Sequence, residues 1–300
     1  MEFFKKTDVD FIKKMKWALL FSGLLTLAGI VSLIAKGGPN LGIDFAGGSL
    51  IQLRFNNTVT IGQIREALTT GGFGNAEIQN IPEDNVIIIR IKKSATPAEN
   101  ILKDVKQLIQ TKLPDNGFIV EQNDMVAPVM GREIYKKGIW AVIGAFAGIM
   151  IYVAIRFKGE TWGTAGIIAL IHDVFVVVTV FSIINKEITM PVLAALLTIA
   201  GFSINDTIVI YDRIRENLKL KRGSTLYQIF NDSINETLSR TIITALTVLL
   251  VLLAIFFKGG EVLHDFSLAL LIGVITGMYS TIFIASPLVY STMVKKRGTR

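Results

Sequence analysis

Six long apolar runs constrain this chain more than any other feature of its sequence. A bilayer core of about 30 Å is crossed by a helix of roughly 20 apolar residues, and lipid cannot satisfy the backbone polar groups of an irregular segment. The chain is 51% hydrophobic and only 18% charged. We therefore predict an α-helical polytopic membrane protein with six transmembrane helices, at residues 17–35, 138–157, 163–184, 190–211, 241–257 and 266–290.

The first run follows a basic N-terminal segment, residues 1–16, as the core of a signal peptide would. Lys13, Lys14 and Lys16 come directly before it. Its apolar stretch is longer than a usual signal core. We expect a retained helix rather than a cleaved leader.

Basic residues in the short connections predict the orientation, because lysine and arginine gather on the cytoplasmic side. The connections after the second and fourth runs and both chain ends are basic, whereas the other two short loops are far less basic. The residues are Lys5, Lys6, Lys13, Lys14, Lys16, Arg156, Lys158, Arg213, Arg215, Lys219, Lys221, Arg222, Lys295, Lys296 and Arg297. Both termini, including the tail 291–300, are expected in the cytoplasm.

Residues 36–135 separate the first two spans and are expected to form one extracytoplasmic domain. Alternating and helical apolar patterns occur there in the order β-α-β-β-α-β, which predicts an inserted α+β ferredoxin-like domain. Thr60 is a candidate N-cap of the first helix, and Thr96 with Pro97 is a candidate start of the second. A Pro-Glu-Asp-Asn turn is expected between the middle strands. This topology alone assigns no function.

Residues 212–240 form an amphipathic cytoplasmic segment between the fourth and fifth spans. Apolar side chains recur there at helical spacing, and Thr225 with Gln228 fits a capping box. We expect a short helix lying at the inner membrane surface.

Ionisable residues inside two of the spans are the strongest functional signal. His172 and Asp173 lie about ten residues into the third span, and Asn205 and Asp206 lie about six residues before the end of the fourth. At 1.5 Å per residue these depths are roughly 15 Å and 9 Å, so the groups can share a layer. An ionised carboxylate at such a depth costs about 2.5 to 3.5 kcal/mol on insertion scales.

The helical faces agree with a relay of protons or other ions. Ser203, Asp206 and Thr207 lie on one face of the fourth span, and Arg240, Thr244 and Thr247 follow the same spacing at the fifth. One alternative is a fixed Asp206–Arg240 ion pair that pins two helices. For His172 and Asp173, each a possible relay residue, the alternative is a role in hydrogen bonding or helix packing only.

The sequence argues against several other classes. It has two histidines on distant segments and no cysteine, a poor set of metal ligands. No nucleotide-binding loop or nucleophilic triad signature is present. We expect no enzyme activity, no catalytic residue, no metal, no cofactor and no nucleic-acid partner.

Small residues and prolines have a structural interpretation. Gly144 and Gly148, and Gly273 and Gly277, form two GxxxG motifs typical of close helix packing. Pro191 and Pro287 are interpreted as helix-end residues rather than hinges.

Five segments in order resemble the motifs of the SecF family of protein-export membrane proteins, which is related to SecD and to resistance-nodulation-division transporters. The resemblance covers nearly the whole chain. The segments are "LGIDFAGGSL", "LIHDV", "GFSINDTIVIYDRIREN", "LSRTIITALTVLL" and "GMYSTIFIASPLV".

The resemblance implies an accessory subunit of the Sec preprotein translocase, which with SecD uses the proton motive force to promote and complete export across the plasma (inner) membrane. Implied partners are SecD, the SecYEG channel, SecA, YajC and an unfolded preprotein. The NDT and SRT motifs imply a proton relay centred on Asp206 and Arg240. Its remaining members are Asn205, Thr207, Ser239, Thr241 and Thr244.

Two further motifs receive positions by the same resemblance. One is implied to join the membrane region to the extracytoplasmic domain and comprises Gly42, Asp44, Phe45, Gly47 and Gly48. The other marks the cytoplasmic boundary and comprises Asp212, Arg213, Arg215, Glu216 and Asn217. A proton- or sodium-driven efflux subunit and a passive scaffold remain open as alternatives.

Overall fold

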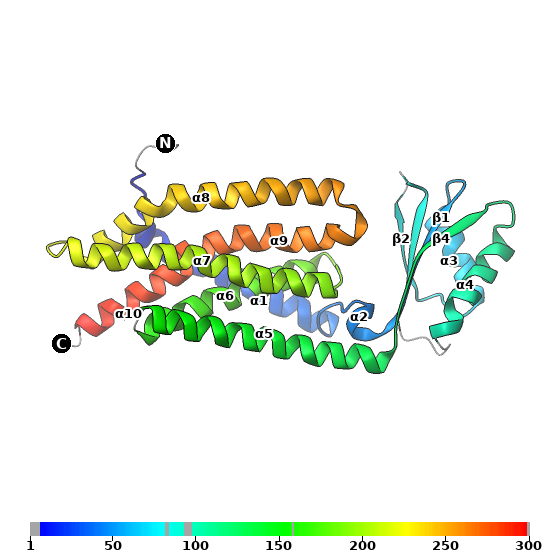
Figure 1. The fold of residues 1–300 in the computed structure, drawn as a ribbon, viewed down its shortest axis with the longest axis horizontal. Helices are drawn as coiled ribbons and strands as arrows, with labels where there is room; N and C mark the ends of the chain where they lie inside the picture. Colours follow the sequence, from blue (N-terminus) through cyan, green and yellow to red (C-terminus); the bar gives the residue numbers. More distant parts are fainter. Residues whose placement is uncertain (1–6, 82–83, 93–97, 158, 299–300) are drawn as a thin grey trace. The chain divides into compact units, whose positions relative to one another are not determined.

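The computed structural model describes residues 7–81, 84–92, 98–157 and 159–298 of the chain. It divides into a helical bundle, formed by Met1–Asn40 and Trp140–Arg300, and an α+β domain, formed by Leu41–Ile139. Each is described by itself below, and Figure 1 labels their elements.

Among the described residues, six helices are long and apolar enough to cross a membrane, in agreement with the predicted number. Most extend beyond the apolar runs, because polar residues with helical propensity continue them. They are α1 (Phe11–Lys36), α5 (Pro128–Phe157), α6 (Glu160–Ile183), α7 (Met190–Leu220), α8 (Leu226–Lys258) and a sixth built from α9 (Gly260–Ser280), a π-helical segment (Thr281–Ala285) and α10 (Ser286–Gly298).

The core of the bundle lies where α6, α7 and the sixth helix pack together. About half of the most apolar stretch of each of these helices is buried, against 6% for α5. Helix α1 packs on α6, and the hydroxyl groups of Ser32 and Ser182 form a hydrogen bond of 2.8 Å between the two helices. The apolar surface of α5 is therefore left to lipid or to another protein.

The two GxxxG motifs have different environments. A Cβ atom on Gly273 would lie 2.2 Å from Cδ1 of Ile199, and one on Gly277 would lie 3.1 Å from Cβ of Ser203. These glycines let the sixth helix approach α7. Gly144 and Gly148 on α5 have no atom within 4 Å of such a Cβ among the described residues, so the predicted close packing at this motif is wrong within the single chain.

The expected short surface helix after residue 225 is not separate. Thr225 and Gln228 form the predicted capping box, but the helix that they start runs on to Lys258. No glycine or proline interrupts it, and its apolar residues Leu226, Phe230 and Ile234 pack into the bundle core. The apolar face of this segment therefore packs against the bundle core, whereas it was predicted to lie against the membrane surface.

The sixth span passes the expected end at residue 290 and continues to Gly298. Pro287 lies two residues into α10, directly after the π-helical segment. A proline inside a helix removes one hydrogen bond and clashes with the carbonyl four residues earlier, and a π-helical turn accommodates such a change. Pro191 lies in the first turn of α7, as predicted.

The α+β domain has the predicted order of strands and helices. Its antiparallel sheet has the strand order β2-β3-β1-β4, and α3 and α4 contribute Ile64, Leu68, Val105 and Ile109 to the buried cluster that includes Ile51 and Leu53 of β1. The bounds are α2 (Ile43–Ala46), β1 (Gly48–Phe55), α3 (Ile61–Thr70), β2 (Glu77–Ile81), β3 (Val86–Lys92), α4 (Ala98–Lys112) and β4 (Phe118–Val126).

The predicted local signals of this domain have different outcomes. Thr60 caps α3 and forms a capping box with Gln63. The proposed start of α4 at Thr96 and Pro97, and residues 82–83 of the predicted turn, lie outside the described residues. Helix α5 already begins at Pro128, before the predicted domain end at 135.

Candidate functional site

Asp173 on α6 lies at the centre of a buried polar layer. Its side chain is fully buried, and its Oδ2 accepts hydrogen bonds from Ser203 at 2.7 Å and from Ser280 at 2.8 Å. Its Oδ1 lies 3.2 Å from Nδ1 of His172. The carboxyl group thus joins α6, α7 and α9.

The layer continues one turn along α7. The Thr207 hydroxyl donates to the Ser203 carbonyl at 3.1 Å and lies 2.8 Å from the hydroxyl of Thr281. Thr281 is the first residue of the π-helical segment. Polar contacts therefore reach the point where the sixth helix changes its winding.

Asp206 lies on α7 beside this layer, and its residue is only 4% exposed. Its Oδ2 atom has no hydrogen-bond partner among the described residues. Arg240 on α8 is close enough for its charge to act on the Asp206 carboxyl, yet no ion pair within 4.0 Å joins the two in the part of the chain that the structure describes. Within the described residues, the two predicted partners thus form no direct ion pair.

The other predicted relay residues are not all gathered at Asp206. Thr241 is buried, and its hydroxyl has no partner among the described residues. The Thr244 hydroxyl bonds instead to the Arg240 carbonyl of its own helix at 2.9 Å, and Thr247 bonds to Thr244 in the same way. Asn205 is exposed and Ser239 is partly exposed. The predicted row of hydroxyls above Arg240 is therefore satisfied within α8.

The predicted boundary motif at the end of α7 connects three helices. Asp212 pairs with Arg156 of α5 at 2.9 Å, and the guanidinium group of Arg215 donates to the Arg156 carbonyl at 3.4 Å. Arg213 binds Glu216 at 2.7 Å and Glu236 of α8 at 2.6 Å.

Asn217 and Lys221 extend these contacts to α8. The Asn217 amide donates to Ser233 at 2.9 Å and to Glu236 at 2.8 Å. Lys221 pairs with Asp232 at 2.6 Å, and this hydrogen bond raises the pKa of the lysine above its ordinary value.

Residues 9–12 are bound to α8 by two asparagines one helical turn apart. The Asn235 side chain accepts from the Val9 amide at 3.0 Å and donates to the Val9 carbonyl at 2.8 Å. The Asn231 side chain accepts from the amides of Phe11 and Ile12. We call these contacts the asparagine clamp.

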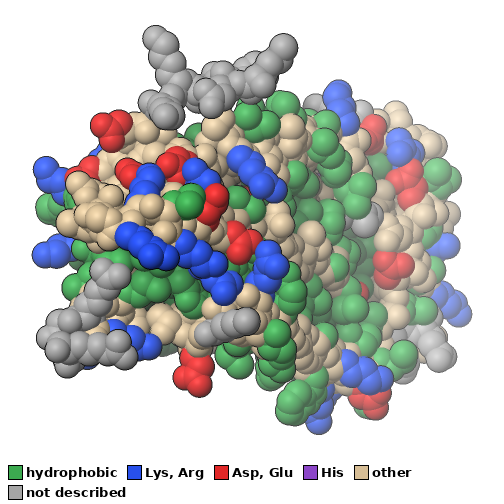
Figure 2. Space-filling model, turned by 60° about the vertical axis from the view of Figure 1, so that its left-hand side comes forward, with side chains coloured by type: hydrophobic (Ala, Val, Ile, Leu, Met, Phe, Trp, Pro, Cys, Tyr) green, Lys and Arg blue, Asp and Glu red, His purple; other side chains and the backbone are tan. Residues whose placement is uncertain are grey.

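The clamp lies at the basic end of the bundle, where α1 begins and α7 is followed by α8 (Figure 1). Asp10 caps α1 and accepts a hydrogen bond from the Tyr227 hydroxyl at 2.5 Å. That bond lowers the pKa of Asp10 below its ordinary value. Figure 2 shows lysine and arginine side chains gathered at this end, with acidic side chains among them.

The predicted join motif starts at the boundary between the two units. Gly47 and Gly48 have φ angles of 75° and 142°, which favour glycine. A Cβ on Gly48 would lie 2.3 Å from the Ile91 carbonyl oxygen. Phe45 is buried, Asp44 lies in the first turn of α2, and Gly42 is its N-cap.

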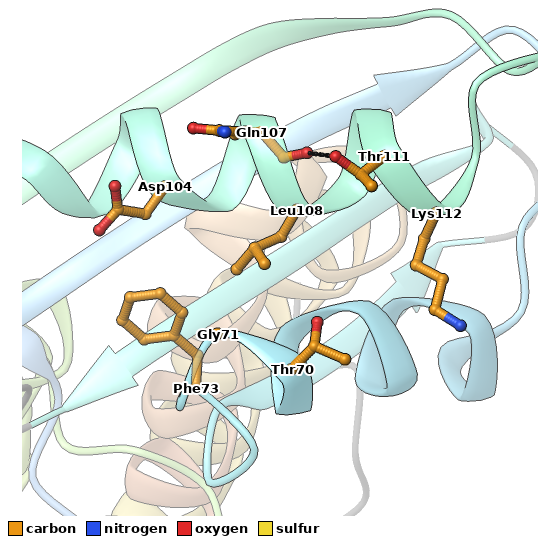
Figure 3. A pocket seen from close by; sticks show the side chains of 8 residues that line it. All are labelled: Thr70, Gly71, Phe73, Asp104, Gln107, Leu108, Thr111 and Lys112. Atoms are coloured by element: carbon orange, nitrogen blue, oxygen red, sulfur yellow. Dashed lines mark hydrogen bonds between the residues drawn. The ribbon is translucent and has the colours of Figure 1, made fainter.

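A surface hollow of about 500 Å³ lies between the end of α3 and one face of α4 (Figure 3). Phe73 and Leu108 give it an apolar floor, and Asp104 and Lys112 lie along its length. Lys112 already pairs with Glu66 at 2.5 Å. The described residues contain no cluster of three or more metal-ligating side chains.

These features define a class of protein: a multi-pass membrane protein whose helical bundle carries buried ionisable side chains and whose chain also forms a small sheet domain. Residues 105–295 match the family described as "Protein export membrane protein SecD/SecF, C-terminal", and residues 32–59 match the "SecD/SecF GG Motif". The chain belongs to the SecF family of Sec translocase accessory subunits.

Relatives of known name agree over almost the whole chain. The "Protein translocase subunit SecF" of Endomicrobium trichonymphae is 40% identical over 295 residues, which are 98% of this chain and 94% of that protein. The protein of the same name from Thermodesulfovibrio yellowstonii is 43% identical over 95% of this chain and 94% of its own length.

Solved structures agree with the fold. The crystal structure of SecDF from Thermus, described as a translocon-associated membrane protein, matches 98% of this chain with a TM-score of 0.84 and 35% identity. A second SecDF structure, in a super-membrane-facing form, matches with a TM-score of 0.73. The present chain spans about 39% and 40% of those two SecDF chains.

Ser280 and Thr281 are site residues that the sequence reasoning did not assign. They interact with Asp173 and Thr207 respectively. Both lie in the segment "GMYSTIFIASPLV" that carried the family resemblance. Ser280 follows the second GxxxG motif by three residues, and a hydroxyl inside a span has few partners other than another polar side chain.

Proposed function

We propose that this chain, together with a SecD partner, uses the proton motive force to promote and complete preprotein translocation. One observation carries the proposal: Asp206 is buried in a span, leaves one carboxyl oxygen without a partner among the described residues, and lies under the charge of Arg240 without an ion pair. A carboxyl group in that position is free to gain and lose a proton.

The cost of a buried charge and the energy that the membrane potential supplies are of similar size. Keeping an ionised aspartate at membrane depth costs about 2.5 to 3.5 kcal/mol, and the membrane potential supplies about 2.3 kcal/mol per charge per 100 mV. Arginine stays protonated throughout. We infer that protonation of Asp206 changes its attraction to Arg240 and thereby the distance between α7 and α8.

A SecD partner is supported by an exposed face on α7 and by the SecDF structures that match this chain. Ala194, Thr198, Gly201 and Asn205 follow one another at helical spacing, and all four are exposed within the single chain. Small and polar residues of this kind allow a second membrane helix to approach closely. The SecYEG channel, SecA, YajC and the unfolded preprotein remain proposed partners.

The proposed orientation has both termini in the cytoplasm and the α+β domain outside. The basic end of the bundle supports it, since positive residues favour the cytoplasmic side. We also class the α+β domain as ferredoxin-like, which its element order and antiparallel strand order support.

The test is the Asp206→Asn variant, reconstituted with SecD and the translocase in proteoliposomes that contain a preprotein. We expect the stimulation of export by a proton gradient to be lost. The matched control is Asp115→Asn in the α+β domain, which makes the same side-chain change at an exposed position and should keep the stimulation.

Three results would contradict the proposal. One is full stimulation of the Asp206→Asn protein by a proton gradient. Another is stimulation of the wild-type protein by a sodium gradient alone. The third is gradient-driven release of small molecules from vesicles that lack the translocase, which would favour an efflux subunit.

A further inference from the structure

The chain contains two histidines, and each comes directly before an aspartate. In both pairs the histidine Nδ1 faces the aspartate Oδ1, at 3.2 Å for His172 and Asp173 and at 3.0 Å for His264 and Asp265. The same dipeptide geometry therefore occurs twice, which permits a comparison within one molecule.

The two pairs differ in charge and burial. Asp265 also binds the ammonium group of Lys186 at 2.8 Å, and its side chain is 25% exposed. The Asp173 side chain is fully buried, and the His172 side chain is 10% exposed. No lysine or arginine among the described residues lies within ion-pair distance of Asp173.

The groups facing Asp173 come from three helices. His172 lies on α6, Ser203 on α7, and Ser280 on α9, where Tyr279 also places its ring 6.1 Å from that of His172. The Tyr279 hydroxyl is already bound to the Ala18 carbonyl of α1 at 2.6 Å. His172 is thus the basic group that can share a proton with the buried carboxyl.

The second nitrogen of His172 completes the arrangement. Its Nε2 is buried and has no partner among the described residues. When one imidazole nitrogen faces a carboxylate, that contact fixes the proton on the near nitrogen and leaves the far nitrogen as an acceptor. Nε2 is therefore the atom at which a proton can enter the pair.

We propose that His172 and Asp173 form a second proton-binding pair in the bundle, distinct from Asp206. An incoming proton binds Nε2 of neutral His172, and the proton on Nδ1 passes to Oδ1 of Asp173. The imidazole stays neutral, and the carboxylate becomes a carboxylic acid. The incoming proton comes from water, and the proposal rests on the proposed use of a proton gradient.

Protonation of Asp173 would be transmitted to its hydroxyl partners. Hydrogen bonds to an ionised carboxylate are roughly twice as strong as those between neutral groups, so the bonds from Ser203 and Ser280 weaken together. Ser203 lies one turn from Asp206, and Ser280 adjoins the π-helical segment. The pair can thus influence both the proposed relay and the sixth helix.

The experiment reads the state of His172 directly, by nitrogen NMR of the full chain with labelled histidine, together with its SecD partner in lipid nanodiscs. The His264→Gln variant removes the other histidine and so assigns the signals. We expect His172 to carry its proton on Nδ1 at alkaline pH. We expect Asp173→Asn to change both the preferred tautomer and the pH response, while Asp265→Asn changes only His264.

Two outcomes would overturn the proposal. One is a His172 signal that is identical in the wild-type and Asp173→Asn proteins. The other is a wild-type His172 whose signals do not change with pH between about 5 and 8, the range in which histidine titrates. The Asp265→Asn protein, changed in the other pair, serves as the fold control and should retain the wild-type His172 tautomer. This readout needs no export, so it fails or succeeds independently of the proposed function.

Discussion

Gly273→Ala should destabilise the bundle at the contact between α9 and α7. The new methyl carbon would lie 2.2 Å from Cδ1, 2.3 Å from Cγ1 and 2.9 Å from Cγ2 of Ile199. Ile199 is 1% exposed. Its β-branched side chain strongly prefers one rotamer in a helix, so either the rotamer or the distance between the helices must change.

The magnitude follows from the contact. Adding a methyl group to a well-packed core costs about 1 to 3 kcal/mol. Gly144→Ala is the matched control. It adds the same group to a helix at a glycine where, among the described residues, no atom would lie within 4 Å of the added Cβ. Any intrinsic preference of a helix for alanine is common to both variants, so the difference between them isolates the clash.

The assay is thermal unfolding of the purified chain in detergent. We expect Gly273→Ala to unfold at a lower temperature than Gly144→Ala, and Ile199→Ala to reduce that difference when the two substitutions are combined. The packing argument fails if Gly273→Ala is as stable as Gly144→Ala. It also fails if Ile199→Ala does not reduce the difference in unfolding temperature between them.

Two other predictions concern separate parts of the chain. Asn235→Ala should remove both clamp hydrogen bonds to Val9. At about 0.5 to 1.5 kcal/mol per bond, this loses about 1 to 3 kcal/mol of stability and should speed amide exchange at residues 9–12. Unchanged exchange would contradict the clamp. The hydrogen bond from Arg54 lowers the pKa of Glu121 from its ordinary 4.5, so the pair stabilises β1 and β4 above pH 4.5, and this stabilisation is lost as the pH falls through the folded value. Glu121→Gln should remove that part of the acid sensitivity of amide exchange in these strands, and an unaltered pH profile would refute it.

The sequence predicted the features that depend on length and spacing. Six spans follow from the bilayer thickness, and the caps at Thr60 and Thr225 follow from side chains that bond to the nearby backbone. The order of strands and helices in the α+β domain was predictable because each element has its own alternating or helical pattern of apolar residues. These signals are local, so no knowledge of distant contacts is needed to interpret them.

The remaining features depend on which helix lies beside which. Gly144 and Gly273 begin identical motifs, and only the second faces another helix. Thr244 has the helical spacing expected of a relay residue, yet its hydroxyl bonds to its own helix. The partner of Asp173 on the sixth helix is 107 residues away. Spacing along one helix does not determine such contacts.

The uninterrupted helix α8 has a mechanical consequence. At 1.5 Å per residue its 33 residues span about 50 Å, which exceeds the bilayer core of about 30 Å. Arg240 lies in its middle part, and the asparagine clamp lies on the same helix about one and a half to two and a half turns away. A stiff rod cannot tilt at one point alone. Any movement of Arg240 toward Asp206 therefore also displaces residues 9–12 at the first turn of α1. Helix α8 thus couples the membrane interior to the start of α1.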